Sequence, residues 1–137
     1  MTPANPDAPA LFLARAREDL RAARHDLTGG FVRAAISRAY FAALHAARAA
    51  LLHTGEAPRT HTGVQRRFAY HFVRTGRVPV EVASVLAYAD TVRSQADYNA
   101  TTLFDTGAAT DLIRDVETFV TTIEGLLPPT TPESNPP

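Results

Sequence analysis

The chain has 137 residues, of which 45% are hydrophobic, and this length and composition fit one domain with a single core. It contains no cysteine, which excludes disulfides, thiolate metal sites and cysteine nucleophiles. Its 14 cationic residues, all of them Arg, balance 14 acidic residues, and a net charge of zero argues against a strongly basic nucleic-acid-binding protein.

The N-terminal part of the chain is typical of a short disordered segment followed by a helix. Residues 1–9 contain three prolines, and they lack the basic region and the apolar run of a signal peptide. From about Ala10 onward, leucine recurs every seven residues, which predicts a helix with one narrow apolar face. This helix is expected to end at Gly29-Gly30.

A second, longer helix is predicted from about Phe31 to His53. Its many alanines favour helix and allow neighbouring helices to approach closely. At about 100° per residue, one face of this helix is apolar and carries Ile36, Tyr40, Ala43, Leu44, Ala47 and Leu51. Arg38 and His45 are seven residues apart and therefore share another, polar face.

Three more helices are predicted in the rest of the chain, from His61 to Arg74, from Pro79 to about Tyr98, and from Thr106 or Thr110 to the residues before Pro128. Residues 128–137 are rich in Pro and Thr and are expected to be disordered. Because no segment alternates with a period of two, we predict an all-α fold, an antiparallel bundle of four or five helices over residues 10–127. No stretch approaches the ~18 apolar residues of a membrane span, and we expect a cytoplasmic protein.

Charge is divided unevenly along the chain. Residues 10–78 hold 12 Arg against four acids, whereas residues 79–137 hold two Arg against nine acids. Two interpretations remain open. Basic and acidic helices can pair within the bundle or across a dimer, or an Arg-rich face can bind phosphate, for which the guanidinium group is well suited.

Arg and His together can cleave RNA without a metal, because His transfers protons and Arg stabilises charge on the phosphate. The pattern of an Arg, four to six further residues and a His occurs three times, as Arg38/His45, Arg48/His53 and Arg66/His71. Chance alone gives nearly as many matches in a chain with 14 Arg and five His. Of these pairs, only Arg38 and His45 lie on one helix face. The competing interpretation is that this pair makes polar contacts at a helix–helix or dimer interface.

Arg93 and Asp97 form an i, i+4 pair of opposite charge near the end of the fourth predicted helix, and Tyr98 follows. The ordinary interpretation is an ion pair on a helix. The functional one makes Arg93 a phosphate ligand oriented by Asp97, with Tyr98 as a hydroxyl donor or stacking platform. The five histidines are too scattered for a metal site and no phosphate-binding loop is present, so we expect no metal and no cofactor.

Three stretches, in this order, resemble HEPN (higher eukaryotes and prokaryotes nucleotide-binding) domains: residues 37–48, Thr60-His61-Thr62-Gly63 with the helix carrying Phe68 and Phe72, and residues 93–98. The chain is similar to small stand-alone bacterial and archaeal members over about Ala10 to Leu127. The resemblance implies a dimerising helical bundle that acts on RNA. Many members are metal-independent ribonucleases of toxin–antitoxin, defence or RNA-processing systems, and some are paired with a minimal nucleotidyltransferase that adds nucleotide to a Tyr.

The sequence departs from the family's nuclease motif, which is an Arg, a polar residue and then a His four to six residues later in a late helix. At that place the chain has Arg93, Ser94 and Tyr98, and no His follows His71. Arg93 therefore carries over, and the His does not.

We consider two functions. The first is an RNA-associated HEPN protein, an endoribonuclease whose candidate catalytic residues are Arg93, His45, Arg38 and Tyr98, and whose candidate RNA or nucleotide contacts are Arg38, Arg93, Asp97 and Tyr40. In it, His45 acts as acid or base only if the fold brings it near Arg93. The second is a non-catalytic HEPN module that binds a nucleotide or docks a partner nucleotidyltransferase. A purely structural bundle is the third interpretation, and a homodimer is expected.

Overall fold

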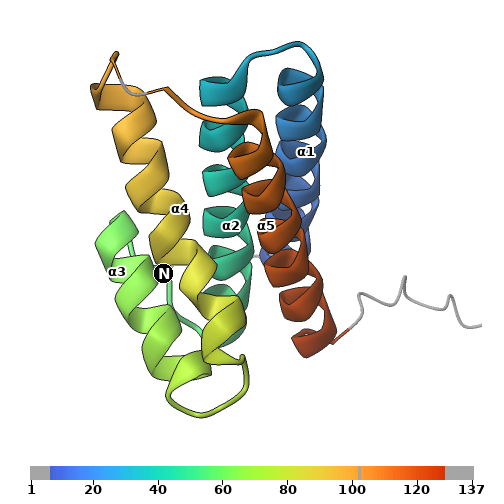
Figure 1. The fold of residues 1–137 in the computed structure, drawn as a ribbon. Helices are drawn as coiled ribbons and strands as arrows, with labels where there is room; N and C mark the ends of the chain where they lie inside the picture. Colours follow the sequence, from blue (N-terminus) through green and yellow to red (C-terminus); the bar gives the residue numbers. More distant parts are fainter. Residues whose placement is uncertain (1–6, 102, 129–137) are drawn as a thin grey trace, which may run out of the picture.

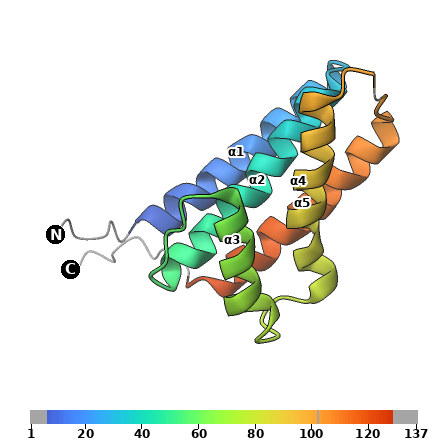
Figure 2. The same ribbon diagram turned by 90° about the vertical axis from the view of Figure 1, so that its left-hand side faces the viewer.

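The computed structural model describes residues 7–101 and 103–128, and every regular element within them is helical. The helices are α1 (Ala8–Thr28), α2 (Val32–His53), α3 (His61–Phe68), α4 (Val80–Tyr98) and α5 (Thr106–Leu126). They form an antiparallel bundle (Figures 1 and 2), which confirms the predicted fold class. Helix α1 begins two residues before the predicted Ala10. The disorder expected at the two ends falls largely on residues 1–6 and 129–137, which lie outside the described residues.

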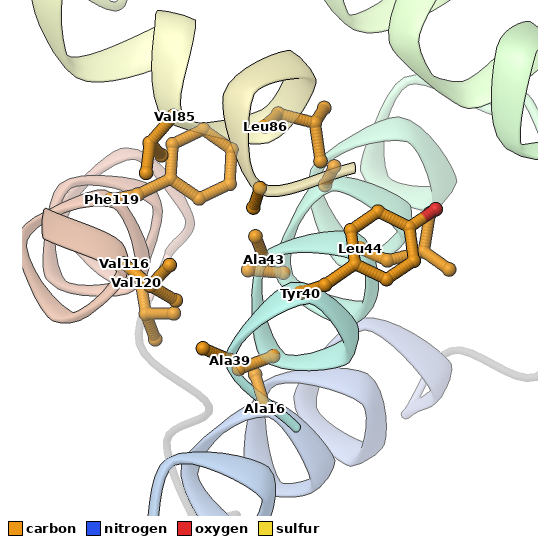
Figure 3. Close-up of a cluster of buried hydrophobic side chains, with 14 of the residues drawn as sticks. Ala16, Ala39, Tyr40, Ala43, Leu44, Val85, Leu86, Val116, Phe119 and Val120 are labelled. Atoms are coloured by element: carbon orange, nitrogen blue, oxygen red, sulfur yellow. The ribbon is translucent and has the colours of Figure 1, made fainter. Parts of the chain in front are cut away.

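Helix α2 is the centre of the bundle, because it packs against α1, α3, α4 and α5. Twelve of its residues are buried, and eight of these are alanines. The small side chains let the neighbouring helices approach closely, and Figure 3 shows Ala39 and Ala43 facing the valines of α5. The whole predicted apolar face of α2, including Tyr40 and Leu44, is buried. None of the described helices has both the length and the apolar character that a bilayer span requires.

The third helix differs from the single helix predicted from His61 to Arg74. Helix α3 ends at Phe68, and the chain continues as a π-helical turn over Ala69–Val73. The N–H of Arg74 donates to the carbonyl of Ala69, five residues back, at 2.9 Å. The stacked rings of Phe68 and Phe72, 5.0 Å apart, are buried as the pattern predicted. An apolar residue at every fourth position does not distinguish an α turn from a π turn.

Ion pairs between α1 and α5 account for part of the uneven charge. Arg17 Nε donates to Glu124 Oε2 at 3.1 Å and Arg17 Nη1 lies 3.5 Å from Glu117, which also contacts Arg24. These side chains are partly exposed, so each pair contributes only about 0–1 kcal/mol to stability. These arginines and glutamates therefore follow the first of the two interpretations of the uneven charge, in which a basic helix pairs with an acidic helix inside the bundle.

Glu56 ties the loop after α2 to the π turn. Arg67 donates to both of its carboxylate oxygens, through Nε at 2.6 Å and Nη2 at 2.9 Å, and His71 contacts the same carboxylate. The hydrogen bonds from Arg67, and then from His71, lower the pKa of Glu56 from 4.5 to about 2. The contact therefore favours the ionised carboxylate.

Acid should weaken this tie. Because the pKa of Glu56 is lower in the folded than in the unfolded chain, its stabilisation is complete above about pH 4.5 and is lost as the pH falls towards 2. We expect the wild-type protein to be more stable than Glu56→Gln at pH 7 and this difference to shrink below pH 4.5, as measured by urea unfolding at several pH values. Glu18→Gln, at an exposed position of α1, is the control. A difference for Glu56→Gln that stays constant down to pH 3 would contradict the expectation.

Candidate functional site

A buried carboxylate lies where α1 meets α2. Asp19 of α1 is only 2% exposed, and its Oδ2 lies 2.7 Å from Nδ1 of His45. Its Oδ1 lies 3.8 Å from Arg15 Nε and 3.9 Å from Arg38 Nη1. A carboxylate removed from water needs such partners, because an unpaired buried charge is costly. Arg38 and His45, predicted to share a face, thus converge on one acid, and we call these four residues the Asp19 cluster.

The Asp19 cluster leaves groups available for a ligand. With Nδ1 of His45 held by Asp19, Nε2 is the ring nitrogen that can exchange a proton with a bound molecule. The side chains of Arg15 and Arg38 are more than half exposed, and their long distances to Asp19 leave N–H groups open to a phosphate. One carboxylate therefore faces two guanidinium groups and a His whose side chain is 18% exposed. A cationic surface results.

A second cluster surrounds Arg93 of α4. Its Nη1 donates to Asp97 and its Nη2 to Asp90, both at 2.9 Å, and its guanidinium lies over the ring of Tyr40, 4.6 Å from the ring centroid. Asp90 also accepts a hydrogen bond from Gln65 of α3 at 2.9 Å. The hydrogen bond to Asp90, and to a smaller extent that to Asp97, raises the pKa of Arg93 above the ordinary value of an arginine. The predicted Arg93–Asp97 pair is present, and with Asp90 as a second carboxylate these three side chains carry a net charge of −1.

The ring of Tyr40 lies beneath the guanidinium group of Arg93. The Tyr40 side chain is fully buried, and burial raises its pKa to about 12, so the hydroxyl keeps its proton at neutral pH. The hydroxyl points away from the apolar cluster that contains Phe119 (Figure 3). Among the described residues, neither this hydroxyl nor Nε of Arg93 has a hydrogen-bond partner. A buried donor without an acceptor costs about 1–3 kcal/mol. Because both atoms are closed to a molecule the size of water, an oxygen of a ligand reaches them only if a side chain moves.

His61, at the start of α3, belongs to the same neighbourhood. Its ring centroid lies 5.6 Å from that of Tyr40 and 6.4 Å from that of Phe41. Burial lowers the pKa of His61, and the charges of Arg48 and Arg93 add to this effect while Asp90 opposes it. The imidazole is therefore neutral at pH 7 and able to accept a proton.

Sequence reasoning missed Arg15, Asp19, Asp90 and His61 as site residues. For Asp19 a signal existed, because it lies three residues after Ala16 and four before Ala23, on the buried face of α1. For Asp90 a signal also existed, because it lies three residues before Arg93 on the same helix, a spacing typical of an ion pair. For His61 there was none, since its contacts with Tyr40 and Phe41 join different helices.

The predicted site residues therefore fall into separate groups. Arg38 and His45 lie in the Asp19 cluster, whereas Arg93, Asp97 and Tyr40 lie in the Arg93 cluster. Within the described chain no hydrogen bond or ion pair joins the two clusters. The ring of Phe41 connects them, since its centroid lies 6.2 Å from His45 and 5.2 Å from Tyr40. Tyr98, 83% exposed, ends α4 and belongs to neither cluster.

A model of the HEPN domain matches residues 10–126, a span that includes both clusters and nearly all of the described helices. No curated protein matches the sequence.

Proposed function

Since the chain belongs to the HEPN domain family, we propose that it acts on RNA, as a metal-independent endoribonuclease. The observation that supports this most is the contact between buried Asp19 and Nδ1 of His45. It holds a proton-transferring ring beside the exposed guanidinium groups of Arg15 and Arg38. No direct contact in the described chain joins His45 to Arg93, as the predicted site required, and in this proposal Arg15 and Arg38 take the place of Arg93. General acid–base catalysis at a phosphodiester can use this combination, with His for proton transfer and Arg for charge stabilisation.

The proposed reaction needs no added reagent. A base removes the proton from a ribose 2′-hydroxyl, the 2′ oxygen attacks the adjacent phosphorus, and the bond from phosphorus to the 5′ oxygen breaks as an acid protonates that oxygen. The products are a 2′,3′-cyclic phosphate and a 5′-hydroxyl. Nε2 of His45 transfers one of these protons, and Arg38 and Arg15 stabilise the charge that builds on the non-bridging oxygens. Arg93, already bound to two carboxylates, acts as a positioning residue for Tyr40.

Cleavage of RNA by the purified full chain in the presence of a chelator tests this function. We expect products with 2′,3′-cyclic phosphate ends, and a rate about 10²–10⁴-fold lower for His45→Gln, whose amide can still donate to Asp19. Arg38→Gln should lower the rate by about tenfold or more. Arg21→Gln, at an exposed position of α1, is the matched control and should cleave like the wild-type protein. Absence of cleavage with structurally diverse RNAs at micromolar protein would overturn the proposal.

A second candidate is a non-catalytic HEPN module that docks a nucleotidyltransferase or binds a nucleotide. Two observations favour it. The charge of Arg93 is more than balanced by Asp90 and Asp97, and the exposed Tyr98 stands where the nuclease motif has a His. Co-expression with a minimal nucleotidyltransferase would then increase the intact mass by one or more nucleotides in the wild-type protein but not in Tyr98→Phe. An unmodified Tyr98 in a protein that cleaves RNA would exclude this candidate.

A further inference from the structure

Two histidines from different helices contact the same aromatic ring. The ring centroid of Phe41 lies 6.2 Å from His45 of α2 and 6.4 Å from His61 of α3. His61 also lies against Tyr40, the residue over which Arg93 is stacked. His61 therefore borders the Arg93 cluster through Tyr40, and it shares the Phe41 ring with His45 of the Asp19 cluster. We propose that His61 is the second proton carrier of the RNA site, acting as base while His45 acts as acid.

This role rests on the proposed ribonuclease function, which assigns one of the two proton transfers to His45 and leaves the other without a residue. Cleavage requires one group that accepts a proton and another that donates one. Helix α4 supplies Arg93 but has Tyr98 where the nuclease motif has a His, and a phenol is a poorer proton carrier at neutral pH than an imidazole. His61 reaches the surroundings of Arg93 from another helix, where no motif along α4 would reveal it.

The surroundings of His61 favour the role of base. The groups that act on it are Arg48 and Tyr40 of α2, and Asp90 and Arg93 of α4. Burial and the two arginines together lower the pKa of His61, so its ring is unprotonated at pH 7 and can accept the 2′-hydroxyl proton. His45 is then left to protonate the 5′ oxygen.

The site also holds donors that lack acceptors. The buried Tyr40 hydroxyl and the Arg93 Nε have no partner among the described residues, and both belong to residues at or next to the His61 contact. Arg93 positions Tyr40, and the Tyr40 hydroxyl stabilises an oxygen that gains negative charge in the transition state once a side chain moves and admits the substrate. The competing explanation is that His61 only packs on Tyr40, in which case its replacement would alter stability and leave the reaction intact.

A substrate with sulfur in place of the 5′ oxygen separates the two histidines. A thiolate leaves without being protonated, so this substrate rescues an enzyme that lacks its acid and does not rescue one that lacks its base. With ordinary RNA, we expect His61→Gln and His45→Gln each to cleave about 10²–10⁴-fold more slowly than the wild-type protein in single-turnover reactions. With the sulfur substrate, His45→Gln should recover to within about tenfold of the wild-type rate, and His61→Gln should stay slow.

The pH profile and a binding measurement complete the test. The rise of the wild-type rate from acid towards neutral pH should disappear in His61→Gln and persist in His53→Gln, an exposed control on α2. Binding of an oligonucleotide with a 2′-deoxy ribose at the scissile position should be unchanged in His61→Gln, which shows that the variant is folded.

The outcomes distinguish the two proposals. If the wild-type protein cleaves RNA and His61→Gln cleaves equally well with the same pH profile, the role of His61 is overturned and the ribonuclease function stands. If the sulfur substrate rescues His61→Gln, the assignment of base is overturned. An inactive wild-type protein overturns the ribonuclease function, and the role of His61 with it.

Discussion

Replacing His45 by Ala is expected to lower the free energy of unfolding by about 3–5 kcal/mol, because it leaves the carboxylate of Asp19 buried without its nearest partner. Asp19 is 2% exposed, and the remaining cations lie 3.8 and 3.9 Å away. Asp19→Ala should cost less, about 2 kcal/mol, since it removes one charged hydrogen bond and the partners that remain can turn to water. Loss of the His45 side chain should therefore lower the free energy of unfolding more than loss of the Asp19 side chain.

Urea unfolding of both single variants and the double variant measures this asymmetry. The double variant should lose less stability than the two single variants together, because the second substitution removes a group that the first has already left unpaired. Asp111→Ala is the control, since its ion pair with Arg114 at 3.2 Å is exposed and should contribute less than about 1 kcal/mol. Equal costs for the two single variants, or strict additivity, would show that Asp19 is satisfied by its arginines alone.

The helices and their inner faces were predictable because helix periodicity is local. Every residue of the apolar face predicted for α2 is buried, and the bounds of α2 and α4 agree with the prediction to within one residue. The two polar pairs within single helices were predictable for the same reason: Arg38 and His45 share an acceptor, and Arg93 contacts Asp97. Spacing along one helix determines which side chains share a face.

Contacts between helices could not be predicted in this way. The position of Asp19 on the buried face of α1 indicated that it needs a partner, but which residue of α2 provides it depends on how the two helices pack. The surroundings of His61 depend on the packing of α2, α3 and α4. Helix α3 places His61 against Tyr40 of α2, and α4 stacks Arg93 on the same ring. The alanines of α2 make these close approaches sterically possible, yet they do not specify the register between helices.

Tyr40 joins the core to the candidate site, and its hydroxyl separates the two contributions. Tyr40→Ala should lower the free energy of unfolding by about 3–5 kcal/mol, because it leaves a cavity in the centre of the bundle. Tyr40→Phe should leave stability unchanged or raise it by up to about 1 kcal/mol, since it keeps the ring under Arg93 and removes a buried donor that has no partner among the described residues. Thermal and urea unfolding measure both changes, with Tyr88→Phe, at an exposed position of α4, as the control.

The effect of Tyr40→Phe on cleavage then tests whether the hydroxyl binds the substrate. A variant as stable as the wild-type protein that cleaves RNA about 10²-fold more slowly would place the donor at the reacting phosphate, because loss of one such donor typically costs 10²–10³-fold in rate. An unchanged rate would restrict Tyr40 to supporting Arg93 and His61. If Tyr40→Phe instead loses more than about 1.5 kcal/mol of stability, the hydroxyl has a hydrogen-bond partner in solution, and it is not a free donor.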